Sequence, residues 1–288
     1  EYIQSKRYDV FFCCHICQSD IAHRSQGVRH LGLVVLLAVL FGLPVGVLAV
    51  SSLAPGWSYP HLWPQEMNVR ALSAVLEQSG TLIRAIGSSL AYSLTTALVT
   101  LVMCFFPAAT FARTAFRGQS LLEGLLLTPA LVPSMTFAMG LHFVFIKIGL
   151  ADTFAGVVLI LAIFSYPYML RSLVTGFSVL GEEYRVCAHN LGAVWWRIAW
   201  SIELPLLMPS IIAGGSVVFL VAFSEYFLVF LIGGGTVPSF TGTLFPLLNS
   251  SNRALASFLT LIFLVLPILL FILVDLFLNR TYRKKGLL

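Results

Sequence analysis

Charged residues are scarce in this sequence. Of its 288 residues only 10% are Asp, Glu, Lys or Arg, whereas 58% are hydrophobic. Soluble domains carry roughly 25% charged residues, and the burial of one core does not account for so large a deficit. Several segments must therefore lack a water-facing side. This composition excludes an ordinary soluble domain and predicts an integral membrane protein.

The motifs of nucleotide hydrolysis and of common hydrolases are also absent. The sequence contains no Gly-x-x-x-x-Gly-Lys-Ser/Thr loop, no His-Glu-x-x-His pair and no Gly-x-Ser-x-Gly turn. It therefore lacks the loop that cradles nucleotide phosphates. We expect no enzymatic activity, no catalytic residue and no bound cofactor, so that any ATP hydrolysis must be performed by another chain.

The five cysteines do not follow the pattern of a secreted, disulfide-linked domain. Cys13, Cys14 and Cys17 stand near His15 and His23 in the N-terminal segment. A metal site there stays open as an alternative, but no second Cys-x-x-Cys or His pair completes a zinc motif. Reduced thiols and no metal are the favoured interpretation.

The sequence has six long apolar runs, each close to the about 20 residues that a helix needs to cross a bilayer. They are residues 31–50, 84–113, 124–146, 153–170, 209–232 and 254–274. The hydrophobicity is continuous rather than alternating, which favours helices over strands. The predicted fold class is an all-α integral membrane protein with about six transmembrane helices.

Lys and Arg are unevenly distributed between the segments that link these runs. If the N-terminus is cytoplasmic, 13 of the 17 Lys and Arg residues fall inside and 4 fall outside. Because cytoplasmic loops hold an excess of Lys and Arg, we predict that both termini are cytoplasmic. The net charge of +5 thus reflects membrane topology, and we expect the lipid bilayer, and no nucleic acid, as a partner.

The runs divide the chain into five expected parts. These are a cytoplasmic tail (1–30), a first transmembrane helix (31–53), an extracytoplasmic loop (54–84), a five-helix core (85–280) and a cytoplasmic tail (281–288). The longest inside loop, residues 177–208, separates the fourth and fifth helices.

This inside loop combines a short amphipathic helix with a turn. Tyr184, Ala188 and Leu191 follow one another at i, i+4 and i+7 and share one helical face. Gly192 permits the left-handed backbone that ends a helix, and Pro205 suits the first turn of the next helix. From the residues alone, the helix either lies on the membrane surface, held by the tryptophans that follow it, or meets a partner protein.

The segment resembles the EAA loop of permease subunits of type I binding-protein-dependent ABC importers. The family pattern is Glu-Ala-Ala, three residues, a Gly-Ala pair and later Ile-x-Leu-Pro. The residues that match in register are Ala188, Leu191, Gly192, Ala193, Ile202, Leu204, Pro205 and Pro209. The resemblance covers roughly residue 85 to the C-terminus and, in its spacing, is nearest the polyamine, ferric-iron and thiamine groups.

The resemblance implies that this chain is a permease subunit in a bacterial cytoplasmic membrane and forms half of a translocation pore. Its expected partners are a dimer of ABC ATPase subunits, a second permease (the same or a related chain) and an extracytoplasmic substrate-binding protein. In this family the EAA loop docks on the ATPase. The implied coupling residues are Glu182, Glu183, Tyr184, Ala188, Leu191, Gly192, Ala193, Leu204 and Pro205.

The chain departs from the family pattern at Val186 and Cys187, where the family usually has Glu and Ala. Val186 cannot accept a hydrogen bond through its side chain. We expect a glutamate one turn upstream to replace the missing carboxylate, Glu183 in preference to Glu182. The alternative is that the apolar face alone holds the helix on its partner.

A single carboxylate lies inside the apolar run 209–232. Glu225 stands 16 residues after Pro209, about 24 Å along a continuous helix. A charge at membrane depth is costly unless it faces water or a partner, so we expect Glu225 to line the translocation path or an interface between permeases. A local hydrogen bond to a neighbouring helix is the alternative. The second function left open is an ion-coupled secondary transporter, although such proteins more often show paired intramembrane charges.

Overall fold

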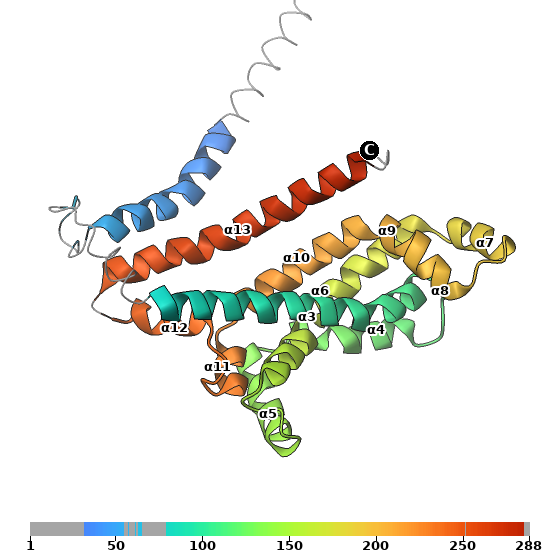
Figure 1. The fold of residues 1–288 in the computed structure, drawn as a ribbon, viewed down its shortest axis with the longest axis horizontal. Helices are drawn as coiled ribbons and strands as arrows, with labels where there is room; N and C mark the ends of the chain where they lie inside the picture. Colours follow the sequence, from blue (N-terminus) through green and yellow to red (C-terminus); the bar gives the residue numbers. More distant parts are fainter. Residues whose placement is uncertain are drawn as a thin grey trace, which may run out of the picture.

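The computed structural model describes residues 32–54, 57, 61, 63–64, 79–250 and 252–284. The expected N-terminal tail with its cysteines, and most of the expected loop 54–84, lie outside the described residues. Within the described part all regular secondary structure is helical (Figure 1). The predicted all-α fold class is confirmed.

An N-terminal helix, Gly32–Leu53, precedes the helices labelled in Figure 1. Those helices are α3 (Ser79–Arg113), α4 (Gln119–Leu127), the 3₁₀ helix η1 (Thr128–Ala130), α5 (Ser134–Lys147), α6 (Phe154–Leu180), α7 (Glu183–Asn190), α8 (Trp195–Ile198), the π-helix η2 (Ala199–Glu203), α9 (Leu204–Leu206), α10 (Met208–Ser224), α11 (Phe227–Gly233), α12 (Phe240–Leu248) and α13 (Arg253–Lys284).

Among the described residues, four helices are long and apolar enough to cross a membrane, and the number rises to six if each of two bent pairs forms one span. The four are Gly32–Leu53, Ser79–Arg113, Phe154–Leu180 and Arg253–Val274. The bent pairs are Gln119–Ala130 with Ser134–Lys147, at 95°, and Trp195–Leu206 with Met208–Ser224, at 73°. About six spans were predicted, and this range includes that number.

Two of the expected spans are not straight helices. The run 124–146 bends at Pro133, whose extended backbone (φ −55°, ψ 131°) separates η1 from α5. Proline lacks the backbone donor that a helix interior requires and disfavours helical geometry in the residue before it. The run 209–232 is interrupted between Ser224 and Phe227, where α10 ends and α11 begins. The expectation of one continuous fifth helix is therefore wrong.

The fourth expected span is longer than its apolar run. Helix α6 continues ten residues beyond Leu170, to Leu180, and Gly181 ends it with a positive φ of 70°. Arg171 therefore lies on the exposed surface of the helix and not in the inside loop. The loop between the fourth and fifth spans begins at Gly181 instead of residue 177.

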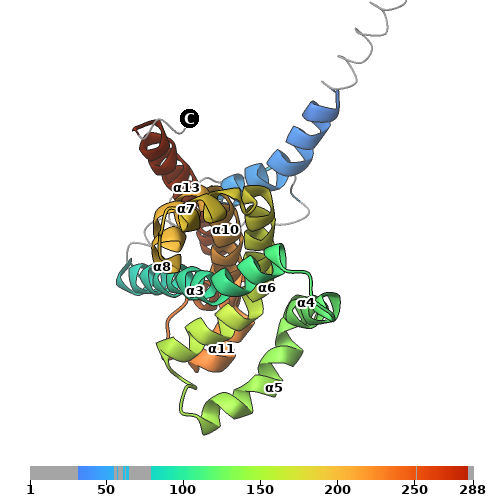
Figure 2. The same cartoon turned by 90° about the vertical axis from the view of Figure 1, so that its right-hand side faces the viewer.

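Helices α3, α6 and α10 pack together along the length of the bundle, and α4 and α5 lie to one side of them (Figures 1 and 2). Helix α13 joins the group through Leu255 and Leu259, which pack in one apolar cluster with Phe219 and Phe223 of α10. The N-terminal helix stands apart, and no residue of its most apolar window is buried.

The contact between α6 and α10 is made by small residues. Ser172 and Gly176 lie four residues apart on α6, as do Ser210 and Gly214 on α10. The Ser172 hydroxyl donates a hydrogen bond to the carbonyl oxygen of Ser210 at 2.7 Å. A Cβ atom added at Gly214 would lie 2.8 Å from Ser172 Cβ, closer than real Cβ contacts. The two backbones therefore approach as closely as small-residue pairs allow in membrane bundles.

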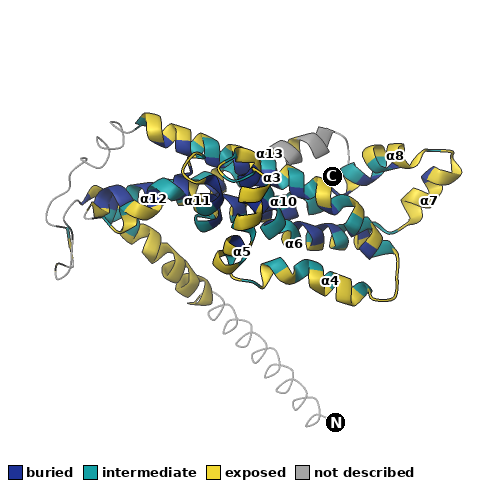
Figure 3. Cartoon of the chain, turned by 90° about the horizontal axis from the view of Figure 1, so that it is seen from below, coloured by how far each residue is buried: buried dark blue, intermediate teal, exposed yellow. Residues whose placement is uncertain are grey.

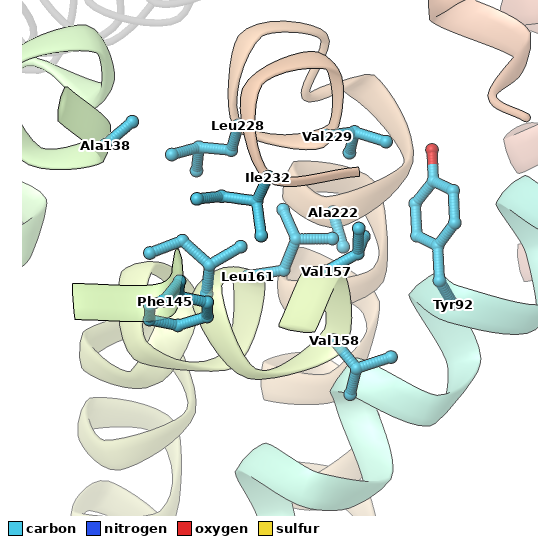
Figure 4. Packing of buried hydrophobic residues seen from close by; sticks show 11 residues of the cluster. Tyr92, Ala138, Phe145, Val157, Val158, Leu161, Ala222, Leu228, Val229 and Ile232 are labelled. Carbon is cyan, nitrogen blue, oxygen red and sulfur yellow. The ribbon is translucent and has the colours of Figure 1, made fainter. Parts of the chain in front are cut away.

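A second apolar cluster attaches the short helices to this frame. Leu161 of α6 and Ala222 of α10 meet Leu228 and Ile232 of α11, with Phe145 of α5 beside them (Figure 4). All five side chains are buried. This packing holds α11 and α5 against α6. It lies beside the break between α10 and α11, where the chain turns away from the axis of the bundle.

We predict that Gly214→Ala destabilises the protein, while its neighbour Gly215→Ala does not. Both residues are inside α10, where Ala is favoured over Gly by roughly 0.5–1 kcal/mol. Only at Gly214 does the added methyl group meet Ser172, and such overpacking costs about 1–3 kcal/mol. At Gly215 the nearest neighbour, Met169 Cε, is 3.9 Å away. Thermal aggregation of the purified variants in detergent checks this, and equal midpoints for the two would contradict it.

Candidate functional site

The inside loop folds as a short helix, a turn and a second short segment at one end of the bundle. Helix α7 ends at Asn190, and Gly192 follows with φ +80°. The N–H of Ala193 donates to the carbonyl oxygen of Ala188 at 3.0 Å, and the N–H of Gly192 donates to that of His189 at 2.9 Å. These bonds satisfy carbonyls that the helix end leaves without partners. The predicted helix and its end at Gly192 are confirmed.

The predicted apolar face of this helix is only partly covered by the protein. Ala188 is 6% exposed, whereas Tyr184 is 56% and Leu191 is 83% exposed. Figure 3 shows α7 and α8 as largely exposed elements at the end of the bundle. Two large side chains of the helix thus present apolar surface that no described residue covers.

The two candidate docking glutamates differ in their surroundings. Glu182 lines a pocket that also contains Arg185 of α7, Arg113 of α3 and Glu203 of the π-helix. Glu183 is exposed and is not among the residues that line this pocket. Both glutamates are exposed, but only Glu182 lies at the pocket beside α3.

The second segment of the loop carries three exposed tryptophans. Trp195, Trp196 and Trp200 form a row with ring centroids 6.0 Å and 5.5 Å apart, and Trp195 also meets Phe106 of α3 at 6.3 Å. Leu204 lies at the end of this row, in the same groove. Pro205 lies in the first turn of α9, as predicted.

A buried ion pair joins this segment to α3. An Nη atom of Arg113, the last residue of α3, lies 2.8 Å from Glu203 Oε1, and the two side chains are only 7% and 8% exposed. The guanidinium also sits over the ring of Phe177, 4.8 Å from its centroid. Its Nε has no hydrogen-bond acceptor among the described residues. The ion pair thus attaches the loop to two membrane helices, α3 and α6.

This pair was not predicted from the sequence. Glu203 is the only charged residue between Arg197 and Glu225 and stands directly before the Leu204–Pro205 step. A carboxylate isolated among apolar residues needs a partner when it is buried, and this was the available signal. The partner could not be read from the pattern, because Arg113 lies 90 residues earlier.

Glu225 lies at the break between α10 and α11, not within a helix. Its backbone is extended (φ −74°, ψ 118°), and Oε1 accepts the N–H of Leu228 at 3.4 Å. Its carbonyl oxygen accepts the hydroxyl of Thr241 at 3.3 Å. The side chain is partly buried, and the hydroxyl of Ser134, the first residue of α5, is a further hydrogen-bonding neighbour of the carboxyl group. The prediction that Glu225 lies within a continuous helix is therefore wrong, because the helix is interrupted at this residue.

Other polar groups gather near the same break. Tyr92 and Ser89 of α3 are completely buried, and their hydroxyl oxygens lie 3.1 Å apart. The Ser89 hydroxyl accepts the N–H of Phe240 at 2.9 Å, where α12 begins. Irregular backbone at membrane depth is tolerated only where it is buried in protein or lines a water-filled cavity. The start of α5, the α10–α11 break and the start of α12 thus form one polar site beside α3.

Comparisons with known proteins identify related chains. The model of the family described as "Binding-protein-dependent transport system inner membrane component" matches residues 106–284. The chain is 31% identical over 143 residues to the molybdate/tungstate transport system permease protein of Thermococcus kodakarensis, which covers 50% of this chain and 58% of that protein. It is 30% identical over 145 residues to the molybdenum transport system permease protein of Haemophilus influenzae, with coverage of 46% and 63%.

A third curated relative is the sulfate transport system permease protein CysT of Escherichia coli, 28% identical over 134 residues, with coverage of 42% and 48%. The chain thus spans about half to two thirds of the length of these relatives. A solved structure titled as a bacterial ABC transporter that imports the acidic polysaccharide alginate has a TM-score of 0.68 and 14% identity. The match covers 88% of this chain and 96% of that one, so the two share a fold.

We predict that Arg113→Met or Glu203→Met alone destabilises the protein by about 3–5 kcal/mol, since each leaves one buried charge without its partner. The double variant should be more stable than either single variant, because no charge then stays buried. Arg117→Met, at an exposed position near the same end of α3, is the control and should be neutral. Thermal aggregation of the four variants in detergent checks the order. If the losses of the two single variants simply add in the double variant, the pair is not coupled.

Proposed function

Because the chain belongs to the family of binding-protein-dependent transport system inner membrane components, we propose that it is the permease subunit of an ATP-driven ABC importer. It forms half of a translocation pore in a bacterial cytoplasmic membrane. The observation that carries the proposal is the exposed helix α7 with its Gly192 turn, at the end of the bundle, in the segment that resembles the EAA loop.

The proposed machine has further parts. A dimer of ABC ATPase subunits binds the α7 end of the bundle, a second permease completes the pore, and an extracytoplasmic binding protein delivers the substrate. The uncovered side chains of Tyr184 and Leu191, together with Glu183, supply the surface for the ATPase. This arrangement places the α7 end, and both termini, on the cytoplasmic side, in agreement with the distribution of Lys and Arg.

The described contacts provide a route from the ATPase to the membrane helices. Movement of α7 passes through the Gly192 turn to α8 and the π-helix. Glu203 at the end of that segment holds Arg113 of α3, and the chain bends by 73° into α10. Closure of the ATPase pair would therefore displace α3 and α10 together, and the far end of α10 is the Glu225 break.

We propose that the polar site around this break lies on the translocation path. The curated relatives are named for molybdate, tungstate or sulfate, so a tetrahedral divalent oxyanion is the first substrate class to test. The similarity in spacing to the polyamine, ferric-iron and thiamine groups stays a prediction. An ion-coupled secondary transporter, the alternative, needs no ATPase and would transport with an ion gradient alone.

We predict that Gly192→Val abolishes association with the proposed ATPase subunit, while the permease still inserts into the membrane. Gly192 has φ +80°, and no atom lies near its missing Cβ, so the effect of substitution is backbone strain alone. Strain of this kind costs about 1–3 kcal/mol. Co-purification of the ATPase with the tagged permease measures the association.

The matched control is Gly192→Asn, because Asn adopts left-handed backbone far more readily than Val. This variant should retain most of the ATPase. Normal co-purification with Gly192→Val would remove the turn from the docking mechanism. Transport by reconstituted wild-type permease without any ATPase, driven by a proton or sodium gradient, would overturn the proposed function in favour of the secondary transporter.

We predict that a cysteine at position 225 faces water. In a background without native cysteines, Glu225→Cys should react with a charged, water-soluble thiol reagent, because the reactive thiolate forms in water and not in lipid. Leu220→Cys is the control, since Leu220 is an exposed apolar residue of α10, five residues before Glu225. We expect its labelling to be at least about tenfold slower, as a thiol in apolar surroundings has a raised pKa. Equal rates at the two positions would place Glu225 outside the path.

A further inference from the structure

An apolar groove runs between the end of α3 and the tryptophan segment. Its walls are Val102 and Phe106 of α3 on one side and Trp195, Trp196 and Trp200 on the other. All five side chains are exposed by more than half of their surface. Tryptophan is typical of the boundary between lipid and water, where one part of the ring is apolar and the other is wet.

The apolar groove continues into a polar pocket. The two share Phe105, Phe106, Trp195 and Ala199 as a common wall. The polar part is lined by Thr110 of α3, by Thr114 directly after α3, by the Arg113–Glu203 pair, and by Glu182 and Arg185 at the start of α7.

Along α3, the residues that line the groove change from apolar to polar toward the end of the helix, as expected where a helix reaches the surface of a membrane. The apolar part spans Leu101 to Phe106, about 10 to 18 Å before Arg113 along the helix axis. The polar part begins at Ala109 and ends at Thr114, where the helix leaves the apolar region. A molecule that fills both parts has an apolar tail toward the middle of the bilayer and a polar head at its surface.

The charged residues that line the polar part indicate which kind of head group it can bind. Within the described segments, the structure records an ion pair between Arg113 and Glu203 and none that involves Glu182 or Arg185. Arg113 and Glu203 neutralise each other, so the pocket offers a ligand one cation and one anion, three residues apart on the same side of α7. An anionic head would pair with Arg185 alone and be repelled by Glu182, whereas a zwitterionic head can pair with both.

We propose that this groove binds an aminophospholipid of the phosphatidylethanolamine type. Its acyl chain packs along the tryptophan row, its phosphate group accepts hydrogen bonds from Arg185, and its primary ammonium group donates to Glu182. The bound lipid fills the space between α3 and the loop that holds Glu203. This site goes beyond the transport role proposed above and does not depend on the transported substrate.

Quenching of tryptophan fluorescence by brominated lipids tests the site. The full chain, with Trp57→Phe and Trp63→Phe so that only the three groove tryptophans remain, is placed in nanodiscs. Lipids with brominated acyl chains and one of three head groups, ethanolamine, choline or glycerol, are added to a non-brominated matrix. Bromine quenches only a tryptophan that it contacts, so the concentration at half-quenching reports the affinity of each lipid.

We expect the ethanolamine lipid to bind about threefold more tightly than the others, because only its ammonium group can both pair with Glu182 and donate an N–H hydrogen bond to it. The choline lipid keeps the positive charge but cannot donate an N–H, and the glycerol lipid has no cation. Glu182→Gln should remove the preference for ethanolamine, and Arg185→Gln should weaken all three lipids. Arg197→Gln, at an exposed arginine that lines neither part of the groove, is the control and should change nothing.

Two results would overturn the proposal. The first is equal quenching by the three lipids in the parent protein, or a preference that survives both Glu182→Gln and Arg185→Gln. The second is loss of quenching when the ATPase subunit is added, which would make the groove a protein-docking surface. Glu182 and Arg185 are exposed, so these variants are expected to fold.

Discussion

The close contact between α6 and α10 is the constraint on which the remaining structure depends. Apolar side chains gain little by leaving lipid for one another, so membrane helices associate where backbones approach closely or polar groups meet. Gly176 and Gly214 remove the side chains that would separate the two helices, and Ser172 bonds directly to the carbonyl oxygen of Ser210. Once α10 is held on α6, the positions of both its ends are fixed.

The backbone changes direction at each end of α10, and at each end polar side chains lie beside the change. At the end near α7, Glu203, four residues before the 73° bend at Leu207, meets Arg113. At the opposite end the Glu225 carboxylate accepts the N–H of Leu228, and the Thr241 hydroxyl donates to the carbonyl oxygen of Glu225. A backbone group without a partner costs several kcal/mol in lipid, so a helix break at membrane depth requires polar side chains beside it. The charged residues of this apolar segment thus mark where its helix is interrupted.

The sequence predicted the membrane runs and the Gly192 turn because both have local signatures, a length of apolar residues and a residue that tolerates positive φ. The 95° bend at Pro133 was not predicted, since hydropathy measures apolar content and is the same for a straight and a broken segment. The extension of α6 past Arg171 was missed for a related reason. A long cationic side chain keeps its head in water while the helix continues, so a charge does not mark a helix end. The Arg113–Glu203 pair joins residues too distant in sequence for any local pattern.

The departure of this chain from the EAA pattern has a structural reading that sequence spacing alone does not provide. The two faces of helix α7 have different surroundings. Ala188 is buried, and Glu182 and Arg185 line the pocket toward α3. Glu182 and Arg185 are exposed, and so are Tyr184, Glu183 and Leu191, but the latter three do not line that pocket. Val186, which replaces the family's glutamate, is also exposed, by 53%. A partner that binds the exposed face therefore meets apolar surface at the position where the pattern has a charge, and Glu183, three residues earlier, is the nearest carboxylate on that surface. If the ATPase docks here as proposed, Glu183 offers it a carboxylate displaced by one turn, while the Arg113–Glu203 pair connects the same loop to α3.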